Sequence, residues 1–193
     1  LNAFRKIKKN PKGKIFVTSG LGGMSGAQPK AGNISGCITI CAEVNIKAIK
    51  TRHSQNWIDE VISDTHKLTK RVKKAQKNKE TVSIAFHGNI VEVWESFYEN
   101  NIKVDIGSDQ TSLHNPWSGG YYPMDLSFEE SNKLISNNPK EFKQRVKSTL
   151  KRHVEIINKH VEKGTYFFDY GNAFLLEASK AKADILKKDG NFK

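Results

Sequence analysis

Short β-prone runs alternate with helical patterns along most of this chain, and that alternation restricts the possible folds more than any other feature. The runs lie at 14–19, 38–44, 82–87, 104–108 and 165–170. Strand alternating with helix is the pattern of a parallel sheet whose two faces are covered by helices. The order therefore predicts an α/β fold, a doubly wound sheet of about five parallel strands with helices on both faces.

Apolar residues spaced about 3.6 apart mark the helices between these runs. One stripe contains Trp57, Ile58, Val61, Ile62, Leu68 and Val72, and a second runs from 90 to 98. The strongest helix signal covers 139–163, because Asn138 can cap it, Pro139 suits its first turn and Gly164 can end it. Ser127 and Glu130 have the spacing of a capping box before a shorter helix, and 172–188 also has a helical pattern.

The formal net charge of +12 raises the question of a nucleic-acid partner. The basic residues alternate with apolar stripes on two predicted helices, as they do on any solvated helix face. No recognition-helix turn, zinc spacing or aromatic-rich basic stretch accompanies them. The pattern favours a solvated surface over a phosphate-backbone footprint, and we expect no nucleic-acid partner.

The two cysteines, Cys37 and Cys41, provide no disulfide framework, which fits a reducing cytoplasm. Neither has a nearby His or Cys, so we expect small buried residues and no metal site. The longest apolar run is too short to cross a bilayer, and no signal peptide is recognisable. With 193 residues, the chain is expected to form one domain over 1–193 with no membrane association.

Polar clusters follow the predicted strands and should meet at one edge of the sheet, because parallel strands all end on the same side. Ligands of such sheets bind outside these carboxyl ends. The first run leads into glycines and the second into Glu43. The third leads into His87-Gly-Asn89, the fourth into residues 108–115 and the fifth into Asp169-Tyr-Gly-Asn172. The two histidines, His87 and His114, could be ligands or acids, although a structural or cofactor-contacting role is the safer interpretation.

The stretch Gly20-Leu-Gly-Gly-Met-Ser-Gly26 follows a predicted strand and can open a helix, which is the context of a dinucleotide-binding fingerprint. Gly20 would make the tight turn, Gly22 would let the backbone approach a pyrophosphate, and Gly26 would allow close packing of helix on strand. Ser25 stands at the usual third-glycine position. By itself the loop could equally be a tight structural turn.

Glu43 favours the dinucleotide interpretation over that turn. It stands at the end of the second run, about 20 residues after Gly22, where an acidic residue contacts the ribose hydroxyls of the adenosine. A carboxylate there would also repel the additional phosphate of NADP. The alternative is a solvated glutamate at a strand end.

The motifs "GKIFVTSGLGGMSGAQPKA", "HGN", "SDQTSLHNP", "GGYYP" and "FDYGNAF" resemble the Rossmann-like NAD-binding domain of the urocanase (urocanate hydratase) family over about residues 13–180. The resemblance implies a cytoplasmic lyase of histidine metabolism, a hydratase that adds water to urocanate to give imidazolonepropionate. NAD serves there as an electrophile, and the full-length enzyme is expected to be a homodimer. It further implies that this chain is an NAD-binding domain excised from a longer urocanase chain.

Position by position, the resemblance assigns NAD contacts to residues that coincide with the strand-end clusters. Together with the turn glycines, the predicted cofactor-binding set is Gly20, Gly22, Gly23, Met24, Ser25, Glu43, Asn89, Ile90, Gln110, Thr111, Ser112, Leu113, His114, Tyr121, Tyr122 and Tyr170. The family often has glycine where Ser25 stands and arginine at the spacing of Ala48, for which Arg52 is a candidate replacement.

The conserved cysteine of the family lies in a segment that has no match here, so we expect no catalytic residue in this chain and no turnover by it alone. Two other classes remain as alternatives. A stand-alone NAD-dependent dehydrogenase lacks a readable acid/base pair for hydride transfer. A basic, non-catalytic binding module would leave the glycine loop and the strand-end clusters unexplained.

Overall fold

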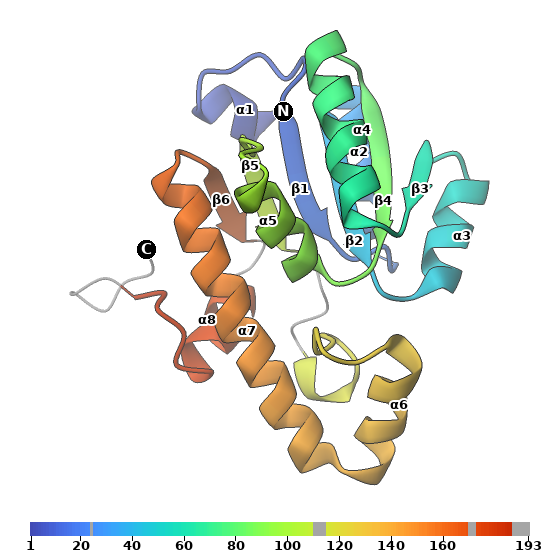
Figure 1. The fold of residues 1–193 in the computed structure, drawn as a ribbon, viewed down its shortest axis with the longest axis vertical. Helices are drawn as coiled ribbons and strands as arrows, with labels where there is room; N and C mark the ends of the chain where they lie inside the picture. The colour runs from blue at the N-terminus through green and yellow to red at the C-terminus, as the bar shows by residue number, and fades with distance from the viewer. Residues whose placement is uncertain (24, 110–114, 170–172, 187–193) are drawn as a thin grey trace.

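The computed structural model describes residues 1–23, 25–109, 115–169 and 173–186, and its centre is a six-stranded, wholly parallel sheet (Figure 1). The strand order is β3-β4-β2-β1-β5-β6. The strands are β1 (Ile15–Ser19), β2 (Ile38–Glu43), β3 (Glu60–Ile62), β4 (Val82–His87), β5 (Ile106–Asp109) and β6 (Tyr166–Asp169). The predicted parallel α/β sheet is confirmed, with one strand more than expected.

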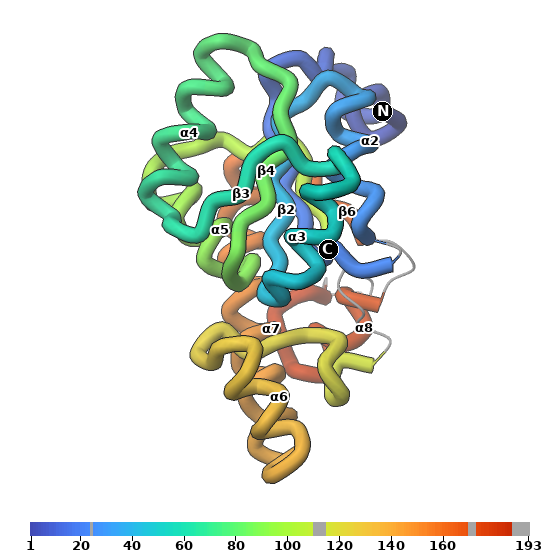
Figure 2. Tube along the Cα trace, turned by 90° about the vertical axis from the view of Figure 1, so that its right-hand side faces the viewer, coloured from blue at the N-terminus to red at the C-terminus, as the bar shows by residue number. Residues whose placement is uncertain are grey.

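Helices cover both faces of the sheet, as Figure 2 shows in side view. On one side are α1 (Asn2–Lys6), α2 (Gln28–Ser35) and α3 (Ile46–Ser54). On the other are α4 (Thr65–Asn78), α5 (Ile90–Glu99) and α7 (Pro139–Glu162). The remaining helices are α6 (Phe128–Asn137), α8 (Ala173–Lys180) and the 3₁₀ turns η1 (Ser25–Ala27) and η2 (Pro116–Ser118).

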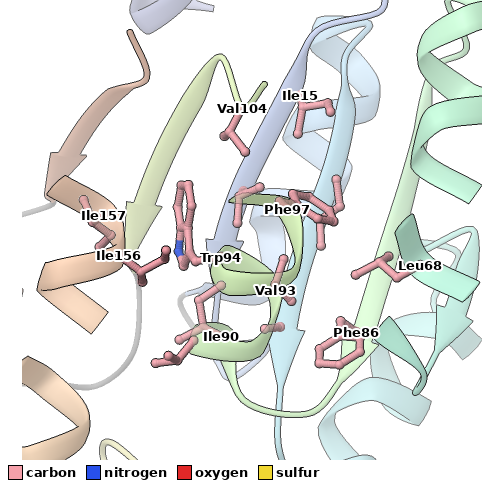
Figure 3. Close-up of a cluster of buried hydrophobic side chains, with 14 of the residues drawn as sticks. Ile15, Leu68, Phe86, Ile90, Val93, Trp94, Phe97, Val104, Ile156 and Ile157 are labelled. Atoms are coloured by element: carbon pink, nitrogen blue, oxygen red, sulfur yellow. The ribbon is translucent and has the colours of Figure 1, made fainter. Parts of the chain in front are cut away.

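The core lies mainly between the sheet and α5, which is packed between α7 and the strands (Figure 3). Trp94 and Phe97 of α5 are fully buried, and Ile156 and Ile157 approach from α7. Gly107 of β5 makes room for the Trp94 indole, because a Cβ there would lie 2.6 Å from Trp94 Cη2. The apolar stripe at 90–98 therefore predicted both the helix and its buried face.

The predicted helix stripe from Trp57 to Val72 is wrong in its first half. Residues 60–62 form the edge strand β3, and α4 begins only at Thr65, where Asp64 Oδ1 accepts a hydrogen bond from Lys67 N. β3 is held by pairing with β4, and the residue before it, Asp59, accepts a hydrogen bond at Oδ2 from Ser83 N of β4 at 2.7 Å. The apolar spacing imitated a helix because apolar residues of the loop before β3, of β3 and of α4 happen to fall at intervals near 3.6 along the chain.

Cap signals located two of the other helices, α6 and α7, well. Ser127 and Glu130 form the expected capping box of α6, and Asn138 Oδ1 accepts from Glu141 N at the start of α7. Gly164, with φ of +89°, follows the end of α7. The last helix is shorter than predicted, because α8 ends at Lys180 and Lys182 turns into the left-handed region with φ of +61°.

The carboxyl ends of the strands all point toward α6 in Figure 1. Beyond this edge, α6, η2 and the first half of α7 form a projection (Figures 1 and 2). The chain winds outward from β1 through β2 in one direction and from β5 to β6 in the other. Such a reversal of strand order opens a crevice at the carboxyl edge, where ligands of doubly wound sheets bind.

Candidate functional site

A cavity of about 240 Å³ lies between the carboxyl edge of the sheet and the projection. Its walls come from the ends of β1, β2 and β4 and from the segment before α6. The lining residues are Ser19, Gly20, Gly22, Ser25, Ala42, Glu43, Val44, Asn45, Ala48, Gly88, Asn89, Ile90, Gly119, Gly120, Tyr121, Tyr122 and Phe128.

The structure brings eight of the predicted cofactor contacts together around this cavity. They are Gly20, Gly22, Ser25, Glu43, Asn89, Ile90, Tyr121 and Tyr122. Gly23 is next to them in the chain, although it is not part of the wall. The predicted contacts Met24, Gln110, Thr111, Ser112, Leu113, His114 and Tyr170 lie outside the described residues. The clusters after β1, β2 and β4 therefore meet at this cavity, whereas the described residues Ser108, Asp109 and Asp169 of the other two clusters do not line it.

Gly20 makes the sharp turn out of β1. Its φ is +85°, a region that side chains with a Cβ rarely adopt, and its N–H donates to Ala42 O at 2.8 Å. The thiol of Cys41 donates to Gly20 O over 3.3 Å. Burial raises the pKa of that thiol, and the neighbouring charges of Glu43 and Asp109 raise it further, so Cys41 is a neutral donor beneath the loop.

Gly22 and Gly23 differ from the other loop glycines because nothing inside the described protein requires them. Neither has a φ in the left-handed region. A Cβ at Gly22 would meet only Ser25 Oγ at 3.8 Å, and a Cβ at Gly23 would meet nothing within 4 Å. Within the described residues, no hydrogen bond engages the backbone N–H of Gly22 or Gly23. Open space over two such donors suits a ligand that approaches the backbone closely.

The predicted packing role of Gly26 is wrong. A Cβ at Gly26 would lie 2.8 Å from Arg52 Cζ, so this glycine makes room for an arginine of α3. The close contact between helix and strand is made at Gly32 of α2, where a Cβ would lie 2.8 Å from Thr39 Cβ. The helix starts later than the fingerprint implies, because η1 precedes α2, and this moves the contact point along the chain.

Glu43 connects the ends of the first two strands. Its Oε2 accepts from Leu21 N and its Oε1 from Asn45 N, both at 2.8 Å. Each carboxylate oxygen has a second lone pair, so both can still accept a hydroxyl. Glu43 is half-buried in the cavity wall. Burial of the neighbouring Tyr122 phenol raises the pKa of Tyr122, and the charge of Glu43 raises it further.

Asn89 is held in the wall by three hydrogen bonds. Its Oδ1 accepts from Val91 N and caps α5, and its own N–H donates to Glu92 Oε2. Its Nδ2 donates to Tyr122 O at 3.0 Å, which attaches the segment before α6 to the end of β4. Asn89 therefore shapes the cavity by joining two of its walls.

The two adjacent tyrosines point in different directions. Tyr121 is 2% exposed, and its hydroxyl lies 3.0 Å from Nδ1 of the fully buried His153. Burial lowers the pKa of His153 to about 3, so the ring is neutral. Tyr122 is only half-buried, donates to Asn132 Oδ1 and packs on Phe128. Tyr122 thus has its ring on the cavity, while the Tyr121 hydroxyl is engaged in the core.

At the end of β5, Ser19 Oγ donates to Asp109 Oδ2 over 2.6 Å, and Thr18 Oγ1 lies 2.9 Å from Ser108 Oγ. These buried contacts join β1 to β5 at the point where the strand order reverses.

Five wall residues were not identified from the sequence, namely Ser19, Ala42, Val44, Asn45 and Phe128, whereas Gly88, Gly119 and Gly120 stood in the motifs HGN and GGYYP without a role assigned to them. Except for Phe128, which begins α6, the five lie in or directly after β1 and β2, and only that position could have indicated them. His87, considered as a possible ligand, lies with Nε2 3.2 Å from Val44 O and so contacts the backbone between β2 and α3.

A second cavity, of about 490 Å³, lies under α1 and is lined largely by apolar side chains such as Phe4, Phe16 and Phe168. It contains none of the predicted contacts that the structure describes. We assign the site to the smaller cavity, because convergent polar groups and backbone donors give a ligand its orientation.

The described residues contain no group of three His, Cys, Asp or Glu side chains placed to hold a metal ion. Within the same part of the chain, no helix combines the length and the apolar character of a membrane span.

Comparison with known proteins gives consistent matches over the whole chain. The sequence profile of the urocanase Rossmann-like domain matches residues 1–193. The chain is 55% identical over 190 residues to probable urocanate hydratase of Dictyostelium discoideum, covering 97% of this chain and 28% of that protein. It is 50% identical over 198 residues to urocanate hydratase of Mus musculus (99% and 29%) and 49% identical over 195 residues to that of Homo sapiens (97% and 29%). The chain spans less than a third of the length of these relatives.

Proposed function

Because this chain belongs to the urocanase family, we propose that residues 1–193 form the NAD-binding domain of a urocanate hydratase. The complete enzyme would add water to urocanate to give imidazolonepropionate, a step in the degradation of histidine. This chain would contribute the cofactor site, and the catalytic residues would lie in the rest of the enzyme. The similar proteins are urocanate hydratases, which does not favour a stand-alone dehydrogenase or a basic binding module.

The observation that carries the proposal is the open space over Gly22 and Gly23. A glycine that neither a positive φ nor a crowded neighbour requires is explained by a ligand that needs the bare backbone. Consecutive backbone N–H groups form concavities that bind anions, and the diphosphate of NAD is such an anion. The residues present therefore fit the cofactor.

Glu43 would bind the ribose hydroxyls of the adenosine half. Its two oxygens are already oriented by the N–H groups of Leu21 and Asn45, and each can accept one more hydrogen bond. A phosphate on the ribose would meet this carboxylate, so we propose selection of NAD over NADP. The cavity of about 240 Å³ is smaller than the roughly 300–1,000 Å³ of typical ligand pockets, which suits one half of a dinucleotide.

The remaining contacts would lie along the same edge. Ile90 and Tyr122 would pack against the cofactor from the ends of β4 and of the segment before α6. We retain Met24, Gln110, Thr111, Ser112, Leu113, His114 and Tyr170 as proposed contacts on the strength of the family resemblance. When bound, NAD would supply an electrophilic ring, and the residues of this chain would bind and orient it.

The proposal extends to the setting of the enzyme. A cytoplasmic location is supported by Cys37 and Cys41, which are both buried free thiols. A homodimer of the complete enzyme is carried over from the family resemblance, and sedimentation of that enzyme tests it.

Release of bound nucleotide from the purified chain tests the cofactor assignment. We expect mass spectrometry to identify NAD, and calorimetry on the nucleotide-free chain to give a lower Kd for NAD than for NADP. A chain that binds neither nucleotide contradicts the proposal.

A second assay follows the ultraviolet absorbance of urocanate with this chain and saturating NAD. We expect no loss of absorbance, because the substrate must also be held and a proton-transferring group positioned against it. Turnover near the rate of a complete urocanate hydratase would place the catalytic residues within these 193 positions.

A further inference from the structure

Arg52 of α3 reaches back about 30 residues in sequence to the glycine loop. Its Nε donates to Leu21 O at 3.1 Å and its Nη2 donates to Gly22 O at 2.6 Å. The third nitrogen, Nη1, donates to Gln55 Oε1 at 2.8 Å. The guanidinium therefore holds two consecutive carbonyl groups of the loop, one with each of two neighbouring nitrogens.

These two bonds, together with the hydrogen bond that Gly22 O also accepts from Gly26 N at 3.0 Å, set the direction of two N–H groups. In a trans peptide the C=O of one residue and the N–H of the next point in opposite directions, and the described chain has no cis peptide. With the carbonyls of Leu21 and Gly22 turned toward Arg52, the N–H groups of Gly22 and Gly23 must point away from it. These are the two donors that have no partner among the described residues.

The guanidinium is itself held in place. It stacks over the Trp57 ring with Cζ 4.9 Å from the ring centroid, and Lys30 Nζ lies 5.3 Å from the same centroid. Gly26 leaves the room that the guanidinium occupies. On the other side of the loop, Glu43 accepts from Leu21 N, so this one residue is fixed at its N–H and at its C=O.

We propose that Arg52 is a positioning residue for the diphosphate of NAD: it orients the N–H groups of Gly22 and Gly23 toward the ligand. The inference rests on the proposed NAD site and adds to it a residue that does not line the cavity. Arginine suits this task because its planar fork presents several donors in a fixed geometry, whereas lysine presents a single point charge.

Three variants separate orientation from charge and from stability. Arg52→Met removes both bonds, and Arg52→Lys keeps the charge without the fork. Arg71→Met is the matched control, because Arg71 is also partly buried and bonded, to Glu60 and Glu80, and belongs to α4 on the opposite face of the sheet from α3. The probes are NAD and adenosine, which lacks the diphosphate. Kd is measured by calorimetry for NAD and by NMR titration for adenosine, with folding checked by circular dichroism.

We expect both Arg52 variants to weaken NAD binding about tenfold or more, because charge-assisted bonds that orient the loop are lost. Adenosine affinity should be unchanged in both, and Arg71→Met should lower the Tm while leaving the Kd for NAD as in the parent. An Arg52→Lys chain that binds NAD as tightly as the parent overturns the role of the fork. Equal losses for adenosine and NAD overturn the specific link to the diphosphate.

The parent chain provides a test that does not depend on the folding of any variant. Titration with ADP should shift the amide ¹⁵N resonances of Gly22 and Gly23 more than that of Gly164, a glycine remote from the site. Resonances of Gly22 and Gly23 that do not move contradict the inference. A parent that binds no NAD refutes the proposed function as well, whereas a parent that binds it with unchanged Arg52 variants refutes the role of Arg52 alone.

Discussion

Gly22 and Gly23 of the loop differ from Gly32 of α2 and Gly107 of β5 in what occupies the place of the missing side chain. At Gly32 a Cβ would lie 2.8 Å from Thr39 Cβ, and at Gly107 it would lie 2.6 Å from the Trp94 ring. At Gly22 and Gly23 that place is open. A crowded glycine is required by the fold, whereas an open glycine without a positive φ is explained by what binds there. Glycine content alone therefore cannot separate structural from functional positions.

Tyr121 and Tyr122 repeat this difference between neighbours in the chain. The Tyr121 hydroxyl meets His153 in the core, where burial and the charge of Asp109 raise the pKa of the phenol. Tyr122 is half-buried beside Glu43 at the cavity. Tyr121 stabilises the packing of α7 against the segment before α6, and Tyr122 is available to a ligand.

The largest effect is expected for Gly32→Val, which tests the difference between crowded and open glycines. Its side chain would overlap Thr39 of β2, so we expect the free energy of unfolding to fall by about 3 kcal/mol. Urea denaturation measures this change. Gly23→Ala is the matched control, because its Cβ meets open space, and its unfolding free energy should stay within about 0.5 kcal/mol of the parent. Equal stability of the two variants would remove the distinction between crowded and open glycines.

Gly22→Val tests whether an open glycine of the loop serves ligand binding. The fold should be retained, because a Cβ there is in ordinary contact with Ser25 Oγ. NAD affinity should fall about a hundredfold, since the side chain would occupy the approach to the backbone donors. Equilibrium dialysis gives the affinity and circular dichroism the fold. A folded variant that binds NAD like the parent would make the loop a purely structural turn.

Lowering the pH should reduce the free energy of unfolding of the chain through the buried His153. Its pKa in the folded chain is about 3, whereas the ordinary value is 6.5, so at falling pH the unfolded chain takes up the proton first. This contribution to stability is present above 6.5 and is lost as the pH falls toward 3. Between pH 7 and pH 5 the loss is about 2 kcal/mol, and His160, whose pKa burial also lowers, acts in the same direction.

His153→Gln removes this titrating group, so the difference between parent and variant measures its contribution to the free energy of unfolding. Between pH 7 and pH 5, the free energy of unfolding of the variant, measured by urea denaturation, should fall by about 2 kcal/mol less than that of the parent. His66→Gln, at an exposed position of α4, is the control and should follow the parent. Identical pH profiles for parent and His153→Gln would contradict a neutral, buried His153.

The smallest effect is expected at Glu43, which belongs to both regions because it holds the loop and faces the cavity. Glu43→Ala should weaken NAD binding about tenfold and narrow the preference over NADP, as a charge-assisted contact is lost. Glu43→Gln keeps an acceptor without the charge, so it should restore part of the NAD affinity and still admit NADP. Calorimetry with both nucleotides separates the two contributions, and unchanged affinities for both would exclude the ribose contact.

Much of this architecture follows from local signals in the sequence. The apolar runs located five strands, and the capping residues Ser127 and Asn138 located two helices, because caps and buried runs depend on near neighbours. Strand β3 escaped detection. It is only three residues long at the edge of the sheet, its Val61 is 42% exposed, and its pairing with β4 joins residues far apart in the chain. The carboxyl edge could be predicted because parallel strands present all their ends on one side.

The sequence by itself determined the parallel sheet, the sharp turn at Gly20 and the acidic strand end at Glu43, since each depends on residue type and order. Only the tertiary structure decided that Gly32 rather than Gly26 meets the sheet, and that Arg52 reaches the loop. It also decided that Tyr121 turns inward beside Tyr122. These outcomes depend on distances between residues that are remote along the chain, and no local preference of the backbone or side chain encodes such distances.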